Sequence, residues 1–322
     1  MQPNNKEFQR AGRRDLIKRN VLKSVVEKIR QQIPFVIPQA NGSFIAKIED
    51  GEVHKLHHID IPFNSKSVIS DNGLVVSLCR ERNLLRIHEI SGKLITEKKG
   101  SDYKAIACRG NTVFLGGEYE DESSKEGEVF VLLNLEDPNF EIKEIRLPIK
   151  LSEGKGIDDL LILEEELLVV DNMIFPKYLF RYDISSPNDP KHLETINLPK
   201  NGPYEYIIKG DLNEHWLVLF SSTIGRQGAK QHLSISGKEE GHISIGRNLK
   251  EKYHIKDFCL LKSELYILRS DCLGKIKLEE GINMDNFKEI ITKKNTWERI
   301  VKTPTNQIIL IEPNAHELVE KS

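Results

Sequence analysis

Hydrophobic and polar positions alternate in short blocks over most of the chain after residue 42. Residues 157–163 and 167–170 are apolar runs short enough for buried strands, and the glutamates at 164–166 predict a charged turn between them. A more polar strand is expected at 178–184, then the turn sequence SSPNDP, then an alternating edge strand at 192–198. This stretch therefore predicts four antiparallel strands whose burial falls from the first strand to the fourth.

The same four-strand pattern recurs along the chain. Predicted first strands begin near residues 67, 103, 157, 204, 255 and 297, a spacing that suits four-stranded blades with loops of varying length. The pattern predicts an all-β, six-bladed β-propeller over residues 35–322, in which residues 297–319 and 43–61 together form the blade that closes the ring. A strand at Phe35–Ile37 would provide a seventh blade.

The third predicted blade carries a family resemblance. Its sequence LLVVDN, followed by YDISSPNDP and a strand ending in LP, resembles the bacterial LVIVD-type repeat of WD40-like propellers. The preceding blade, GEVFVLLNLEDPNFEIKEIRLP, resembles the repeat in part. That family is defined by its repeat and shares no catalytic residues, so the resemblance implies a propeller fold and no particular chemistry.

The first 34 residues follow a different pattern. Apolar residues recur at helical spacing from Leu22 to Ile33, and Pro34 ends the pattern. Nine basic residues stand against three acidic ones here, so the segment carries +6 in a chain whose formal charge is −2. We expect residues 1–34 to form a basic amphipathic α-helix. This helix either packs on the propeller or docks on a protein, a nucleic acid or an anionic membrane surface.

Composition narrows the class of protein. Charged residues make up 30% of the chain and hydrophobic residues 39%, as in soluble globular proteins. No apolar run approaches 18 residues and the first residues lack a secretory signal, so we expect a cytoplasmic protein without a membrane span. The four cysteines occur singly, without metal-ligand spacing, and are expected to be buried thiols.

The two faces of the predicted ring differ in charge. Turns after strands one and three emerge on one face and are mostly acidic, whereas loops after strand four, on the other face, are mostly basic. Loops after strand two mix both signs. We interpret the basic face, together with the N-terminal helix, as the docking surface for an acidic protein, with nucleic acid as the alternative partner. The predicted partner-binding residues are Arg10, Arg13, Arg14, Lys18, Arg19, Arg80, Arg82, Lys150, Lys155, Arg226, Arg247, Lys250, Lys252 and Arg269.

Motifs for common enzyme chemistry are missing from the sequence, which has no phosphate-binding loop, serine nucleophile elbow or zinc-protease motif. We therefore expect a non-enzymatic scaffold for protein–protein interaction in a larger assembly, without a cofactor. Asp211, Glu214 and His215 are grouped in GDLNEHW, which we expect to be a solvated turn.

The enzyme alternative is a metal-dependent hydrolase at the mouth of the channel. Six-bladed propellers include calcium-dependent sugar-lactone hydrolases, whose metal is held by Asp, Asn and Glu, and oxygen ligands suit such a hard cation. The residues at comparable strand ends in this chain are Glu118, Asp171, Asn172, Asp271 and Glu312.

Overall fold

The computed structural model describes most of the chain from residue 30 onward. The described ranges are 30–50, 52–79, 82–99, 103–117, 129–147, 156–171, 178–198, 205–225, 228–239, 242–244, 248–250, 254–280, 286–292 and 296–319. Most of the predicted N-terminal helix, residues 1–29, lies outside these ranges. Residues 30–32 form a single helical turn.

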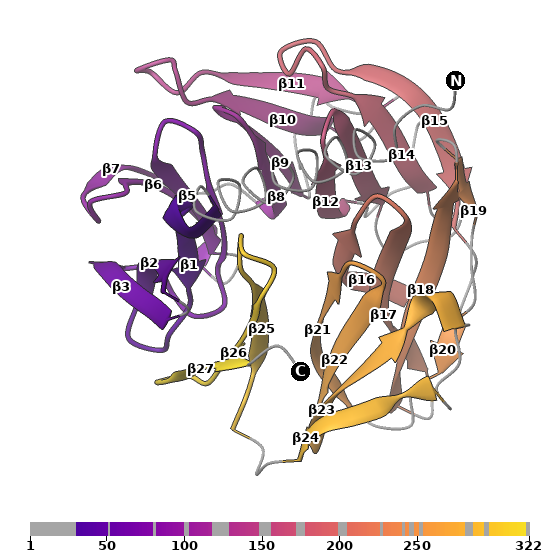
Figure 1. Ribbon diagram of the computed structural model, residues 1–322. Coiled ribbons are helices and arrows are strands. Elements are labelled where there is room, and N and C mark those ends of the chain that lie inside the picture. Colours follow the sequence, from indigo (N-terminus) through magenta and orange to yellow (C-terminus); the bar gives the residue numbers. More distant parts are fainter. Residues whose placement is uncertain are drawn as a thin grey trace, which may run out of the picture.

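The described strands form seven antiparallel sheets arranged in a ring (Figure 1). The sheets of the first half of the chain contain β1 (Phe35–Ile37), β2 (Ser43–Glu49) and β3 (Glu52–Ile59); β4 (Lys66–Ile69), β5 (Leu74–Cys79), β6 (Leu84–Glu89) and β7 (Leu94–Lys99); β8 (Tyr103–Arg109), β9 (Thr112–Gly117), β10 (Val129–Asn134) and β11 (Ile142–Arg146); and β12 (Ile157–Leu163), β13 (Glu166–Asp171), β14 (Tyr178–Asp183) and β15 (Lys191–Asn197).

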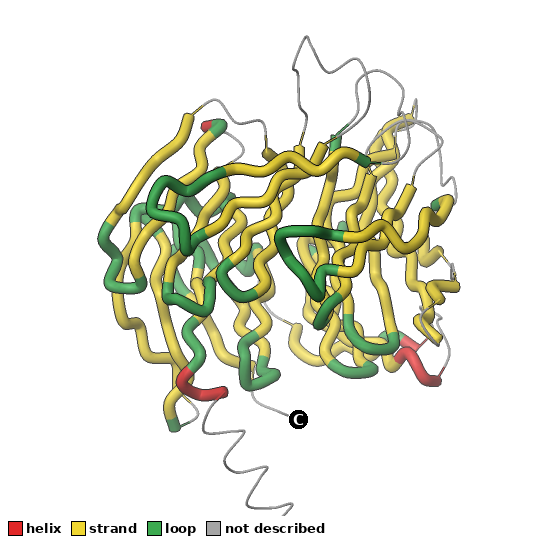
Figure 2. Tube along the Cα trace, turned by 90° about the horizontal axis from the view of Figure 1, so that it is seen from above, coloured by secondary structure: helices red, strands yellow, loops and turns green. Residues whose placement is uncertain are grey.

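The second half of the chain completes the ring. Its sheets contain β16 (Glu205–Leu212), β17 (Trp216–Gly225), β18 (Gly228–Glu239), β19 (His242–Ser244) and β20 (Asn248–Lys250); β21 (Ile255–Leu261), β22 (Glu264–Arg269), β23 (Cys272–Lys277) and β24 (Lys288–Thr292); and β25 (Arg299–Lys302), β26 (Ile308–Ile311) and β27 (His316–Val319). The first strands of neighbouring sheets contact one another around the centre. Seen from the side, the strands run between the two faces of the ring (Figure 2).

Alternation along each strand builds the core. In β13, Leu167 and Val169 join the apolar cluster shared with the preceding sheet, whereas Leu168 and Val170 join the cluster shared with the following sheet. Neighbouring side chains on a strand point to opposite faces, so one apolar run supplies two interfaces. Each pair of adjacent sheets is joined by such a cluster, which makes the described sheets one continuous ring.

The two ends of the described chain meet in this ring. Phe35 and Ile37 of β1 pack in one cluster with Ile309 and Ile311 of β26, although the two sheets are not hydrogen-bonded to each other in a common ladder. The propeller fold is as predicted. The residues predicted to close the ring in one blade, 297–319 and 43–61, lie in two sheets that pack on each other without a shared ladder. If these two three-stranded sheets are counted as one closing blade, the ring has six blades. By hydrogen bonding they are two separate sheets, which is the arrangement expected from the sequence if Phe35–Ile37 forms a strand.

The blade at residues 157–199 has the predicted strands, but its burial follows a different order. The second strand, β13, has its apolar side chains fully buried, whereas β12 becomes partly exposed towards its end and β15 is mostly exposed. β13 lies between two strands and packs against other sheets on both faces. β12 is the innermost strand of its sheet, and part of it borders the central channel.

Candidate functional site in the central channel

The inner strands share a local irregularity at their beginnings. Register shifts, each marking a β-bulge, fall after Tyr103, Ile157, Ile207 and Ile255 in β8, β12, β16 and β21. A bulge adds one residue and re-aims the side chains that follow it. Polar residues lie next to these bulges, and their side chains line the central channel.

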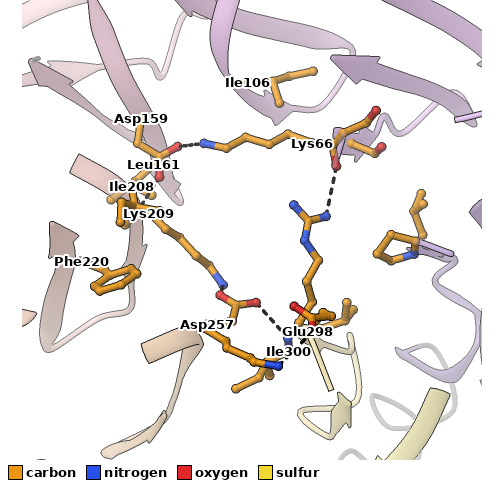
Figure 3. Close-up of a pocket in the computed structure, with 18 of the residues that line it drawn as sticks. Lys66, Ile106, Asp159, Leu161, Ile208, Lys209, Phe220, Asp257, Glu298 and Ile300 are labelled. Carbon is orange, nitrogen blue, oxygen red and sulfur yellow. Dashed lines mark hydrogen bonds and ion pairs between the residues drawn. The ribbon is translucent and has the colours of Figure 1, made fainter. Parts of the chain in front are cut away.

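A pocket of about 480 Å³ lies among these strand beginnings. Its wall combines apolar side chains, which include Ile106, Leu161, Ile208 and Phe220, with four cationic and three acidic side chains (Figure 3). The charged residues are Lys66, Lys209, Lys256, Arg299, Asp159, Asp257 and Glu298. Because the inner strands begin here, this end of the channel lies on the face where loops after strands two and four emerge.

Asp159 connects three sheets around the pocket. Its Oδ1 accepts a hydrogen bond from Lys66 Nζ at 2.8 Å, and its Oδ2 accepts one from the backbone N–H of Gly210 at 2.7 Å. Lys66 belongs to β4, Asp159 to β12 and Gly210 to β16. A buried carboxylate that accepts hydrogen bonds through both oxygens in this way holds the inner strands in register.

Asp257 repeats this arrangement further along the ring. Its Oδ1 accepts from Lys209 Nζ at 2.7 Å, and its Oδ2 accepts from the backbone N–H of Ile300 at 2.8 Å. Burial acts to lower the pKa of Lys209, but Asp257 and Asp211 outweigh it, so this pKa lies above its ordinary value and the lysine is charged. The pair therefore joins β16, β21 and β25.

Asp211 corrects one sequence-based expectation. The strand β16 continues to Leu212, so Asp211 is a strand residue and only Glu214 and His215 are exposed in the turn. The Oδ2 of Asp211 accepts the backbone N–H of Leu260 at 2.7 Å, which links β16 to β21. Burial raises the pKa of this carboxyl group, although Lys209 and the backbone donors act in the opposite direction.

Among the described residues, Arg299 is the pocket cation that has no carboxylate partner. Lys256 Nζ pairs with Glu298 Oε1 at 2.9 Å, so each of the three pocket carboxylates has a lysine partner. No carboxylate in the described ranges forms an ion pair with Arg299. Its Nη1 donates instead to the carbonyl oxygens of Phe63, at 2.8 Å, and Ser65, at 3.4 Å, and its guanidinium lies 5.4 Å from the centre of the Phe63 ring.

Few of the predicted partner-binding residues fall within the described part of the chain. Arg82 is exposed between β5 and β6, and Lys250 ends β20. Arg269 is buried: its Nε and Nη2 donate to the two carboxylate oxygens of Asp271, and its guanidinium lies 4.9 Å from the centre of the Phe287 ring. Its position is that of a structural ion pair. Outside the described ranges lie Arg10, Arg13, Arg14, Lys18, Arg19, Arg80, Lys150, Lys155, Arg226, Arg247 and Lys252.

In the described part of the chain, the candidate metal ligands do not lie together. Asp271 is occupied by Arg269, Glu312 accepts a hydrogen bond from Thr296, and Asp171 ends β13. Glu118 and Asn172 lie outside the described ranges. Within those ranges, no group of three or more His, Cys, Asp or Glu side chains is arranged to hold a metal ion.

The cysteines are free thiols, of which Cys79, Cys259 and Cys272 are buried and Cys108 is partly buried. Burial raises the pKa of Cys108 and of Cys259 to about 12 and that of Cys272 to about 11. These three thiols are therefore protonated at neutral pH and are poor nucleophiles.

Sequence reasoning overlooked the charged residues of the channel. A signal was present, because Asp159, Lys209, Asp257 and Arg299 are charged residues beside apolar ones in predicted inner strands. A charged residue in a buried strand requires a partner. The missing information was which strands face one another across the ring.

Comparison with known proteins places the fold. No family model and no curated protein matches the chain. The WD40 β-propeller domain of Doa1 matches with a TM-score of 0.57 at 9% identity, over 91% of each chain. Streptogramin B lyase matches with a TM-score of 0.52 at 14% identity, over 89% of this chain and 93% of that one.

The extracellular domain of BT4673 from B. thetaiotaomicron has a TM-score of 0.54 at 14% identity. The match covers 88% of this chain but only 38% of that one, so this chain spans less than half of that larger protein. At these identities the likeness shows a WD40-like propeller fold alone. Among the residues described, no helix is long and apolar enough to cross a bilayer.

Proposed function

We propose that this chain is a non-enzymatic scaffold that binds an acidic protein partner on the face where the channel pocket opens. The observation that carries the proposal is the charge balance of that pocket, in which four cationic side chains face three carboxylates that are all paired. The surplus positive charge lies at the centre of the face whose loops are predicted to be basic. An electrostatic surface of this kind steers an acidic partner and sets its orientation.

The occupied carboxylates support a role without catalysis. Asp159 and Asp257 each accept from a lysine and from the backbone of the next inner strand, so both oxygens of each residue already serve contacts within the fold. A general base needs an oxygen that can reach the proton it removes. These aspartates instead stiffen the ring, and a rigid platform loses little entropy when a partner binds.

The experiment compares two charge reversals on one sheet. Arg82→Glu changes an exposed loop between β5 and β6, on the proposed docking face, and Lys93→Glu changes an exposed turn between β6 and β7, on the opposite face. Proteins recovered with the tagged full-length chain are identified by mass spectrometry at low and high salt. We expect a partner whose recovery falls with salt and with Arg82→Glu, but not with Lys93→Glu.

Two results would contradict the proposal. Equal recovery from both variants would move the contact away from this face. Recovery of nucleic acid that is lost on nuclease treatment, with no direct protein partner, would favour the nucleic-acid alternative, for which binding to a defined RNA or DNA falls steeply with salt.

A further inference from the structure

The channel pocket contains one cationic group whose N–H donors are only partly hydrogen-bonded by the described residues. Arg299 donates to the Phe63 and Ser65 carbonyl oxygens through Nη1, while the described residues provide no partner for its Nε and Nη2. A guanidinium has five N–H donors in a planar fork, which matches a carboxylate. Burial lowers the pKa of Arg299, and Asp257 only partly offsets this, so a bound anion would stabilise the charge further.

A second unused donor lies beside the first. Ser65, whose backbone carbonyl accepts from Arg299, also lines the pocket and is only 6% exposed. Its Oγ is buried and has no hydrogen-bond partner among the described residues. A buried hydroxyl without a hydrogen-bond partner is energetically unfavourable. A ligand oxygen that accepts from it would remove this cost.

The rest of the pocket defines the class of ligand. Its lysines are already paired with carboxylates, so the surplus charge corresponds to one anionic group. Ile106, Leu161, Ile208 and Phe220 provide an apolar wall for the remainder of the ligand. A volume of about 480 Å³ falls in the range of small-molecule sites.

We propose that Arg299 and Ser65 form a binding site for a single carboxylate group carried on an apolar stem. The carboxylate belongs either to a free small acid or to an acidic side chain of a bound protein. Both sources present the same chemistry to the guanidinium and the hydroxyl. The site does not depend on the docking proposal, because a free acid would fill it without a partner.

The test uses the full-length chain and isothermal titration calorimetry. The probes are hexanoate, its neutral amide hexanamide, and a blocked tripeptide with one central glutamate. We expect hexanoate to bind at least tenfold more tightly than hexanamide if the source is a free acid. If the source is a protein side chain, the glutamate tripeptide binds and the same tripeptide with glutamine does not.

Two variants tie the binding to the named residues. Arg299→Met should weaken carboxylate binding at least tenfold, whereas Arg109→Met, at an arginine paired with Glu165 away from the pocket, should leave it unchanged. Arg299→Met also removes the hydrogen bonds to Phe63 and Ser65, so its folding must be checked. Ser65→Ala removes only an unpaired hydroxyl and should weaken binding severalfold in a folded protein.

The inference is overturned if no carboxylate binds at millimolar concentration. Equal binding of the acid and the amide would also overturn it, as would unchanged affinity in both pocket variants. None of these outcomes depends on Arg82 or Lys93, so failure of this site and failure of the docking face are distinguishable.

Discussion

Several buried charges in the described part of the protein are paired with residues on other strands. Arg181 in β14 pairs with Glu166 at 2.8 Å and with Glu194 at 2.5 Å, all within one sheet. Asp159 and Asp257 instead connect different sheets. Removing one member of such a set leaves another charge or backbone donor unpaired. The resulting loss of folding free energy exceeds the stabilisation that the intact pair contributes.

Replacement of Asp159 tests this at the residue scale. Asp159→Ala leaves Lys66 and the N–H of Gly210 without their acceptor and should lower the free energy of unfolding by about 2–3 kcal/mol. Asp159→Asn keeps one acceptor oxygen and should cost about half as much. Urea denaturation provides the comparison.

Glu89→Ala is the control for Asp159, because it removes an exposed pair with Lys93 and should change the denaturation midpoint little. If Asp159→Ala were as mild as this control, the carboxylate would have no structural role.

His88 predicts a pH dependence of stability. This side chain is buried in β6, and burial lowers its pKa below the ordinary value of about 6.5, with Arg86 acting in the same direction and Asp60 against it. The unfolded chain therefore binds a proton at higher pH than the folded protein does. The stability gained from neutral His88 is present above about pH 6.5 and is lost as the pH falls from there through the folded-state pKa.

We expect the wild-type free energy of unfolding to fall between about pH 7 and pH 5, and to fall less in His88→Gln. His316, whose pKa burial also lowers, remains in both proteins, so the difference between them reports on His88. Parallel pH profiles for the two proteins would refute the assignment.

At the scale of single elements, packing between a strand and its loop depends on one glycine. A Cβ at Gly274 in β23 would lie 2.2 to 2.7 Å from ring atoms of Phe287, so the ring packs directly on the strand backbone. The same ring contacts the Arg269 guanidinium. Glycine is required here for close approach.

Gly274→Ala should displace Phe287 and lower the free energy of unfolding by about 1–3 kcal/mol. The matched test is the double variant with Phe287→Ala, in which the added methyl group has room. We expect the alanine at 274 to be nearly neutral in that background, and a coupling near zero in the double-mutant cycle would exclude the ring as the cause.

At the scale of the whole molecule, closure of the ring depends on apolar contacts between the two ends. Ile311 of β26 is fully buried in the cluster that contains Phe35 and Ile37 of β1. A closed ring leaves no open interface between its first and last sheets. The closing cluster therefore joins segments that are far apart in the sequence.

Ile311→Ala should lower the free energy of unfolding by about 2–4 kcal/mol and increase hydrogen exchange in both β26 and β1. Leu193→Ala, at an exposed position of β15, is the control and should change stability by less than about 0.5 kcal/mol. Increased exchange confined to β26 would show that the two ends are not coupled.

The strands and the propeller were predictable because their signals are local. The runs at 157–163 and 167–170 and the turn at 185–190 depend only on neighbouring residues, and the strands were predicted to within one residue or two. The placement of Asp211 was wrong because a polar sequence before a turn does not show where the strand ends. Its carboxylate accepts from Leu260 on another sheet, a partner that the local sequence does not identify.

By itself, the sequence determined an all-β ring of repeated antiparallel sheets, because strand alternation and turn residues act over a few neighbours. Only the tertiary structure decided which charges meet. Lys66 and Asp159 are 93 residues apart, and the ring brings them to 2.8 Å from each other. That same closure leaves Arg299 without a carboxylate partner among the described residues, because charge balance in a channel is decided by all the inner strands together.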